Sequence, residues 1–234
     1  MKICDKGYES SPFVVALYYG NAKPKNVNYY VGDFVEETTN LTNHGISVGE
    51  REHGFKIMAI VADSPARAFL KCVKGATAYY GCERCTVEVK TCNKRRVSSQ
   101  LDCELRTKES FRDQTHQGHH LKDAKTGEFL VSPLLTIPHF DPIKDFPLET
   151  MHLLNLNVMK NLAEKWMKLE KNSHKPPVDK RQAFKELMSS ISTGVTIEFQ
   201  RNEFDVDDIC HWRATQYSFL LLYAGKHCPP VRIG

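Results

Sequence analysis

The stretch FKIMAIVADSPARAFLKCVKGATAYYGCERC, residues 55–85, decides the fold prediction for this chain. It opens with an apolar run, Ile57–Ala62, whose length and β-branched residues are typical of a buried strand. Asp63 ends the run, and Ser64-Pro65 begins a segment whose apolar residues have helical spacing. Because proline suits the first turn of a helix, this pattern places the Asp63 carboxylate at a strand-to-helix turn.

An α/β unit is predicted from this stretch and the residues that precede it. Phe13–Tyr19 is apolar and predicts a strand, and Val27–Asn43 carries apolar residues at mainly helical spacing. Asn26 is suited to cap the start of that helix, and Gly45 is suited to end it. A strand, a helix and the Ile57–Ala62 strand make a β-α-β unit, which favours a parallel pair with a right-handed crossover.

The composition changes along the chain and predicts one domain with three parts. Residues 1–78 are the α/β core, in which alternation around Ile46 and Val48 adds a short strand. Residues 79–145 form a polar, cysteine-bearing insertion with little core of its own. Residues 146–234 are mainly helical, with helices expected over residues 153–169, roughly 180–190 and 205–224, and with Trp166 and Trp212 in the core.

The overall composition is that of a globular protein, with 41% hydrophobic and 26% charged residues. A net charge of +4 is compatible with a polyanionic partner but is too small to indicate one. The apolar run near the N-terminus is too short to span a membrane, and the first residues do not resemble a secretory signal. The eight cysteines, five of them between Cys72 and Cys103, are therefore expected to be reduced thiols or metal ligands.

Other polar and aromatic residues are weaker candidates for contacts with a ligand. The basic residues that suit phosphate contacts, with a solvated basic face as the ordinary alternative, are Lys71, Lys74 and Lys94–Arg96. The aromatic residues that suit stacking on bases, with local packing as the alternative, are Tyr79 and Tyr80. The histidines expected in an exposed loop, without a metal, are His116, His119 and His120.

A family resemblance is carried by four segments that are spread across most of the chain. They are ALYYGNAKPKNVNYYVGDFVEE (residues 16–37), IMAIVADSPARAFLKCVKGATAYYGCERCTVE (57–88), FPLETMHLLNLNVMKNL (146–162) and HWRATQYSFLLLYAG (211–225). In sequence, order and spacing these segments resemble the transposase-derived proteins of eukaryotic cut-and-paste elements, and most closely the CACTA-type (En/Spm-like) group.

The resemblance implies a ribonuclease-H-like fold, in which three acidic residues hold two divalent cations, magnesium or manganese, for DNA cleavage and transfer. By this resemblance Asp63 occupies the second acidic position. The first is expected upstream of Phe13 and the third beyond Gly234, so the chain is expected to be an internal, inactive piece of a catalytic domain. On its residues alone, Asp63 is an N-cap of the helix that follows it.

The resemblance also implies a zinc site. The family's zinc-associated signature is a C-x-x-C pair followed by D-x-x-H, and it maps onto Cys82, Cys85, Glu149 and His152. Glu149 stands where the signature has aspartate. A C-x-x-C turn places two thiolates on one tetrahedral zinc ion, and a second pair of ligands closes the site. Cys92 and Cys103 are the competing second pair, and reduced thiols without a metal are the plain alternative.

The sequence thus predicts a transposase-like, DNA-processing domain fragment that is catalytically inactive because two of its three metal-binding acids are absent. The alternative is a non-catalytic, zinc-stabilised protein that binds DNA, another protein or a second copy of the chain. A truncated gene product without a function of its own is the third hypothesis. Nuclear residence follows from the resemblance alone.

Overall fold

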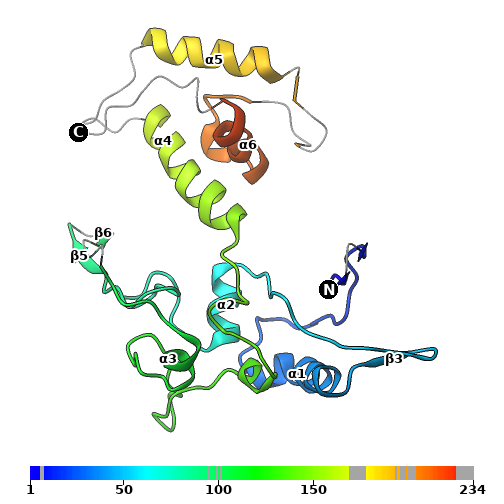
Figure 1. Ribbon diagram of the computed structural model, residues 1–234. Coiled ribbons are helices and arrows are strands. Elements are labelled where there is room, and N and C mark those ends of the chain that lie inside the picture. The colour runs from blue at the N-terminus through cyan, green and yellow to red at the C-terminus, as the bar shows by residue number, and fades with distance from the viewer. Residues whose placement is uncertain are drawn as a thin grey trace. The chain divides into compact units, whose positions relative to one another are not determined.

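The computed structural model describes residues 1–5, 8–93, 95–98, 100, 102–168, 178–192, 194–195, 199 and 204–224. Within these ranges the chain combines helices with short antiparallel hairpins, which confirms a mixture of α and β structure (Figure 1). Two compact units are present, the first Met1–Ile60 with Ser64–Phe146 and the second Val61–Asp63 with Pro147–Gly234. None of the helices in these ranges has the length and apolar character that crossing a lipid bilayer requires.

The longest helix of the first unit, α1 (Val27–His44), confirms the predicted helix and both of its caps. The Asn26 side chain accepts the backbone N–H of Asn28 at 2.8 Å, as expected of an N-cap. Gly45 has φ of 73°, and its N–H donates to the Leu41 carbonyl at 2.8 Å. This positive φ suits glycine and ends the helix where the sequence predicts.

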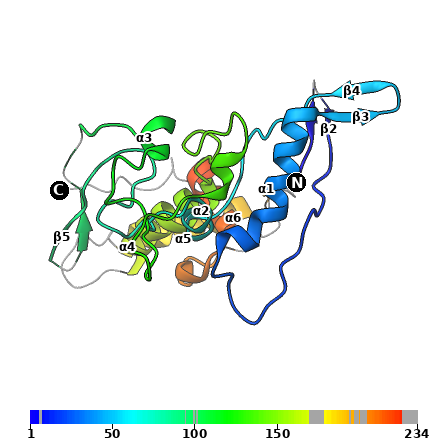
Figure 2. The same ribbon diagram turned by 90° about the horizontal axis from the view of Figure 1, so that it is seen from below.

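The sheets of the described structure are two-stranded antiparallel hairpins. They pair β1 (Cys4–Asp5) with β2 (Tyr8–Glu9), β3 (Ile46–Val48) with β4 (Arg51–His53), and β5 (Lys90–Cys92) with β6 (Arg95–Val97). The β3–β4 hairpin follows directly on the C-terminal end of α1 and projects from it (Figure 2). The predicted short strand around Ile46 and Val48 is confirmed.

Neither strand predicted to flank α1 is present in the described structure. Phe13–Tyr19 and Ile57–Ala62 run without strand pairing, so the predicted β-α-β unit with its parallel pair does not form. Ile57 and Ile60 pack against the core of the first unit, whereas Met58 is 72% exposed. A strand forms only where a neighbouring strand takes up its N–H and C=O groups, and an apolar run does not by itself supply that neighbour.

The core of the first unit joins α1 to the end of the polar segment. The other helical elements of this unit are α2 (Ser64–Lys71), α3 (Lys108–Arg112) and the 3-10 turn η1 (Pro133–Thr136). Leu134 and Ile137, in and just after η1, are buried with Val31 and Val35 of α1. The buried apolar residues of the segment 79–145 therefore belong to a core that is shared with α1.

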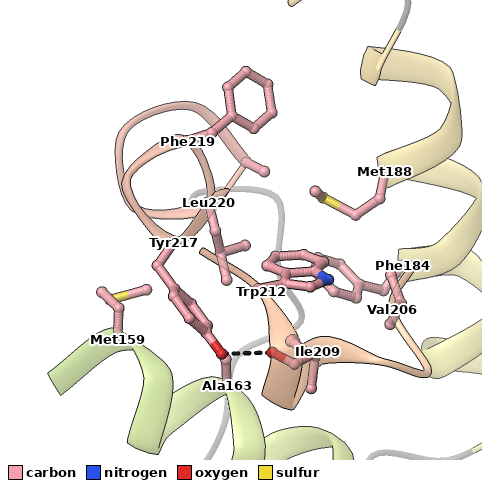
Figure 3. Packing of buried hydrophobic residues seen from close by; sticks show 11 residues of the cluster. Met159, Ala163, Phe184, Met188, Val206, Ile209, Trp212, Tyr217, Phe219 and Leu220 are labelled. Carbon is pink, nitrogen blue, oxygen red and sulfur yellow. Dashed lines mark hydrogen bonds between the residues drawn. The ribbon is translucent and has the colours of Figure 1, made fainter. Parts of the chain in front are cut away.

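The second unit consists of helices around one aromatic core. Its elements are the π-helical η2 (Met151–Met159), α4 (Lys160–Lys168), α5 (Val178–Ser192), the 3-10 turn η4 (Ile209–His211), α6 (Ala214–Phe219) and the π-helical η5 (Leu220–Ala224). Figure 3 shows Met188 of α5 facing the side chains of Trp212 and Leu220. Residue 169 and the side chain of Trp166 lie outside the described part of the chain.

The predicted helix over residues 205–224 is interrupted. Trp212 and Arg213 have ψ of 148° and 165°, so the backbone is extended between η4 and α6. The Trp212 ring N–H donates to the Asp205 carbonyl at 2.7 Å, and the Tyr217 hydroxyl donates to the Ile209 carbonyl. These side-chain hydrogen bonds satisfy backbone carbonyls that a continuous helix would have paired internally, which explains why the apolar spacing did not produce one helix.

Candidate metal centre

The C-x-x-C pair lies on a turn that is held against a second segment of the first unit. Cys85 forms an isolated antiparallel bridge with Leu105, and the Arg106 N–H donates to the Arg84 carbonyl at 2.9 Å. The half-buried Cys103 lies two residues before the bridged Leu105, so this pairing brings its segment to the turn. Cys103 is therefore on the segment that pairs with the C-x-x-C turn, although among the described residues it does not join Cys82 and Cys85 in a group of three closely spaced ligand atoms.

The two sulfur atoms of the pair are in contact and differ in acidity. The Cys85 thiol donates to Cys82 Sγ at 3.4 Å, and the Arg84 N–H also points at Cys82 Sγ, at 3.4 Å. Burial opposes ionisation of Cys82, but these donors and the Arg106 charge lower its pKa overall. Burial and the neighbouring Cys82 raise the pKa of Cys85. The arrangement stabilises one thiolate, which is the form of cysteine that binds metal.

Arginine side chains fix the backbone of the turn. The Arg84 guanidinium donates to the Phe146 carbonyl at 2.6 Å and also to the Ile143 carbonyl. Arg106 Nε donates to the Cys82 carbonyl at 3.0 Å. Because these contacts reach residues far along the chain, the position of the cysteines depends on the folded first unit and not on the local turn alone.

Glu83, inside the C-x-x-C turn, makes a buried ion-pair cluster with α2. Its carboxylate lies 2.9 Å from Arg67 Nε and 3.0 Å from Lys71 Nζ, and the Lys71 side chain is 1% exposed. Burial raises the pKa of Glu83, but the Lys71 and Arg67 charges outweigh it and the net direction is downward. Lys71 therefore neither lies on a solvated face nor is available to phosphates, since it is committed to this cluster.

His119 and His120 are buried, so the prediction that they lie in an exposed loop was wrong. They pack against the ring of Phe111 in the core of the first unit. His119 Nδ1 lies 2.8 Å from the Tyr80 carbonyl, and its Nε2 has no hydrogen-bond partner in the described structure. Burial and the Arg106 charge lower the pKa of His119 to about 3 and that of His120 to about 4.

These buried histidines predict a loss of stability in mild acid. Both are neutral in the folded chain, whereas in the unfolded chain each binds a proton below its ordinary pKa of about 6.5. The free energy of unfolding is therefore highest above about pH 6.5, and it falls as the pH decreases toward the pKa values that the two histidines have in the folded chain. Between pH 7.5 and pH 5, urea denaturation should show a loss of about 2 kcal/mol per histidine.

The same titration in two variants separates this effect from general acid sensitivity. His119→Asn keeps an N–H that can reach the Tyr80 carbonyl and should flatten the pH dependence. His53→Asn, at an exposed position of β4, should leave it unchanged. If the unfolding free energy depended equally on pH in wild type and in both variants, the effect would not come from His119.

Glu149 and His152 are brought together at the start of the second unit. The Glu149 carboxylate accepts the backbone N–H groups of Met151 and His152, at 2.8 and 3.0 Å, and lies 2.6 Å from His152 Nδ1. These N–H groups and the imidazole lower the pKa of Glu149 against the effect of burial. Glu149 thus caps the helix and orients the imidazole. A carboxylate in that role is a common outer partner of a metal-bound histidine.

The predicted site residues are divided between the two units. Cys82 and Cys85 belong to the first unit, and Asp63, Glu149 and His152 to the second. Asp63 is exposed and directly precedes α2. The four-ligand zinc site and the catalytic role of Asp63 stay predictions.

A further group of ligand-type side chains was missed by the sequence analysis. Asp208, Cys210 and His211 lie around η4, with one ligand atom from each within 4.8 Å of the others. Their spacing, D-x-C-H, is visible in the sequence. It is not a C-x-x-C pair of the kind that places two thiolates on one zinc ion.

Comparison of the chain with protein-family models, with curated proteins and with solved structures found no match.

Proposed function

We propose that this chain is the zinc-stabilised part of a transposase-derived protein and that its first unit binds DNA in the nucleus. The relation to transposases, and with it the ribonuclease-H-like ancestry, is supported by the four sequence segments described above. Binding is preferred to catalysis, because two-metal cleavage needs several carboxylates around one position. Within the described ranges, no group of three closely spaced ligand side chains includes Asp63.

The observation that carries the zinc proposal is the contact between Cys82 and Cys85. Their sulfur atoms lie 3.4 Å apart on a turn that is fixed by buried charges, and the environment favours a thiolate at Cys82. Such a pair supplies half of a tetrahedral structural site. Cys103 is the third ligand that the first unit itself can supply, and His152 is the one that the resemblance implies.

A small basic and aromatic surface beside the turn is the proposed contact with DNA. The Arg96 guanidinium lies over the half-exposed Tyr79 ring, 4.2 Å from its centre. Lys74 lines the same hollow, which has a volume of about 310 Å³. Glu88 also lines it and accepts a hydrogen bond from the Tyr80 hydroxyl, which raises the pKa of Tyr80. Cations beside an exposed ring suit phosphates next to an unpaired or distorted base.

Charge reversal at this surface tests the DNA proposal. Arg96→Glu and Lys74→Glu should each weaken binding to a short duplex, and to the corresponding single strand, about tenfold or more at low salt. Each should also lower the dependence of the binding constant on salt concentration, because phosphate contacts release counterions. Fluorescence anisotropy across a range of salt concentrations measures both effects.

Lys56→Glu is the matched control, since Lys56 is an exposed lysine of the same unit away from this hollow. Equal weakening in all three variants would mean that only net charge matters and would overturn the assigned surface. No binding of wild type at low salt would reject the DNA proposal and favour the alternative, a zinc-stabilised protein that binds other proteins. Lys94 and the side chain of Arg95 lie outside the described part of the chain.

A further inference from the structure

We propose that Asp208, Cys210 and His211 form a second metal site, which takes a divalent transition metal such as zinc and is separate from the C-x-x-C pair. Cys210 Sγ lies 3.4 Å from His211 Nδ1 and 3.9 Å from Asp208 Oδ1. His211 Nδ1 is in turn hydrogen bonded to Asp208 Oδ1. One oxygen, one sulfur and one nitrogen therefore converge on one point from a four-residue turn.

The backbone that carries these ligands is anchored to the core of the second unit. The His211 N–H donates to the Asp208 carbonyl at 3.0 Å, which closes the 3-10 turn η4. Ile209 is 1% exposed, and its carbonyl accepts the hydroxyl of the buried Tyr217 (Figure 3). Trp212, on the other side of the ligands, is also buried. A ligand set on a fixed turn loses little conformational freedom when it binds an ion.

The same ligands are open to solvent. The side chains of His211 and Asp208 are 77% and 57% exposed, and Cys210 is half-buried. An ion can therefore reach them without unfolding of the core. Three protein ligands also leave a coordination position for water or for a donor from another molecule.

The geometry argues against a cysteine nucleophile activated by histidine and aspartate. In such a triad the nucleophile and the carboxylate bind different nitrogens of the imidazole ring. Here Cys210 and Asp208 both lie against His211 Nδ1. A sulfur and an oxygen that both approach one ring nitrogen are the arrangement expected where a metal ion can take the place of the proton between these atoms.

The donor set selects the class of metal. Thiolate and imidazole ligands favour zinc, copper, nickel or cobalt over magnesium and calcium, which prefer oxygen alone. Because the thiol and the imidazole must lose protons to bind, affinity should decrease as the pH falls. The alternative is an exposed Asp–His ion pair with a neighbouring cysteine, which binds no metal.

The test uses the full chain with zinc alone and with cobalt as a spectroscopic probe. Wild type should bind a second, weaker zinc equivalent in isothermal titration calorimetry, and cobalt bound there should show thiolate-to-metal absorption. His211→Ala and Cys210→Ser should each weaken that equivalent at least tenfold, and Cys210→Ser should remove its share of the cobalt band. The circular dichroism spectrum should not change, because both side chains lie outside the core.

Cys4→Ser is the control, since Cys4 is an exposed cysteine of the other unit. Asp208→Asn preserves the shape of the turn and should give an intermediate loss. A wild type without a weaker equivalent, or one that Cys210→Ser and His211→Ala leave intact, overturns the proposal. Failure of the C-x-x-C zinc would instead appear as loss of the tighter equivalent, so the two proposals are separable.

Discussion

Replacing both Cys82 and Cys85 with serine should remove one tightly bound zinc from the chain and strongly destabilise the first unit. A structural zinc in a small domain contributes on the order of 10 kcal/mol of folding free energy at neutral pH. The loss should be large here because the turn also holds the Glu83 cluster and the contacts of Arg84 and Arg106. Zinc content by elemental analysis and thermal unfolding on the same samples measure the effect.

Single variants identify the ligands that close the site. Cys103→Ser should lower zinc affinity if Cys103 is a ligand, whereas His152→Ala should do so if His152 is the ligand that the family resemblance implies. Cys92→Ser, in the exposed hairpin strand β5, is the control and should leave zinc content and melting temperature unchanged. Well-folded wild type without zinc would reject the ligand assignment, and the proposed DNA surface would then be tested without it.

Glu83→Gln should destabilise the first unit by about 3–5 kcal/mol, because it removes the carboxylate charge that lies between the buried cations of Arg67 and Lys71. Arg67 and Lys71 are 5% and 2% exposed, so water cannot replace the lost carboxylate. The glutamine keeps the size of the side chain, which separates loss of charge from loss of packing. Urea denaturation at pH 7.5 measures the difference, and zinc content should fall with it.

Lys71→Met combined with Glu83→Gln provides the internal check. Removing the lysine charge should recover part of the lost stability, because only the Arg67 cation then stays buried beside the glutamine. Glu50→Gln, at an exposed position between β3 and β4, should change stability by less than about 0.5 kcal/mol. A similar small effect for Glu83→Gln would show that the cluster is solvated in solution and that the C-x-x-C turn does not depend on it.

The features that sequence reasoning predicted correctly are those set by neighbours within one helical turn. The α1 helix and its caps at Asn26 and Gly45 depend on hydrogen bonds between residues two to four positions apart. Such interactions form wherever the local sequence permits, so a pattern in the sequence is sufficient to predict them.

The strands at Phe13–Tyr19 and Ile57–Ala62 failed for the opposite reason. Their apolar content was read correctly, but a strand also needs a partner from elsewhere in the chain, and the described structure supplies none. The long helix expected over residues 205–224 does not form because side-chain hydrogen bonds from Trp212 and Tyr217 engage the backbone carbonyls of Asp205 and Ile209.

For the candidate site, the sequence by itself determined the ligand types and the C-x-x-C spacing, since both are properties of a few adjacent residues. Only the tertiary structure paired the segment that follows Cys103 with the C-x-x-C turn, committed Lys71 to Glu83 and buried His119. Each of these depends on which distant segments exclude water from a charge or an imidazole. Burial of that kind is decided by the packing of the whole unit, which no local pattern of residues records.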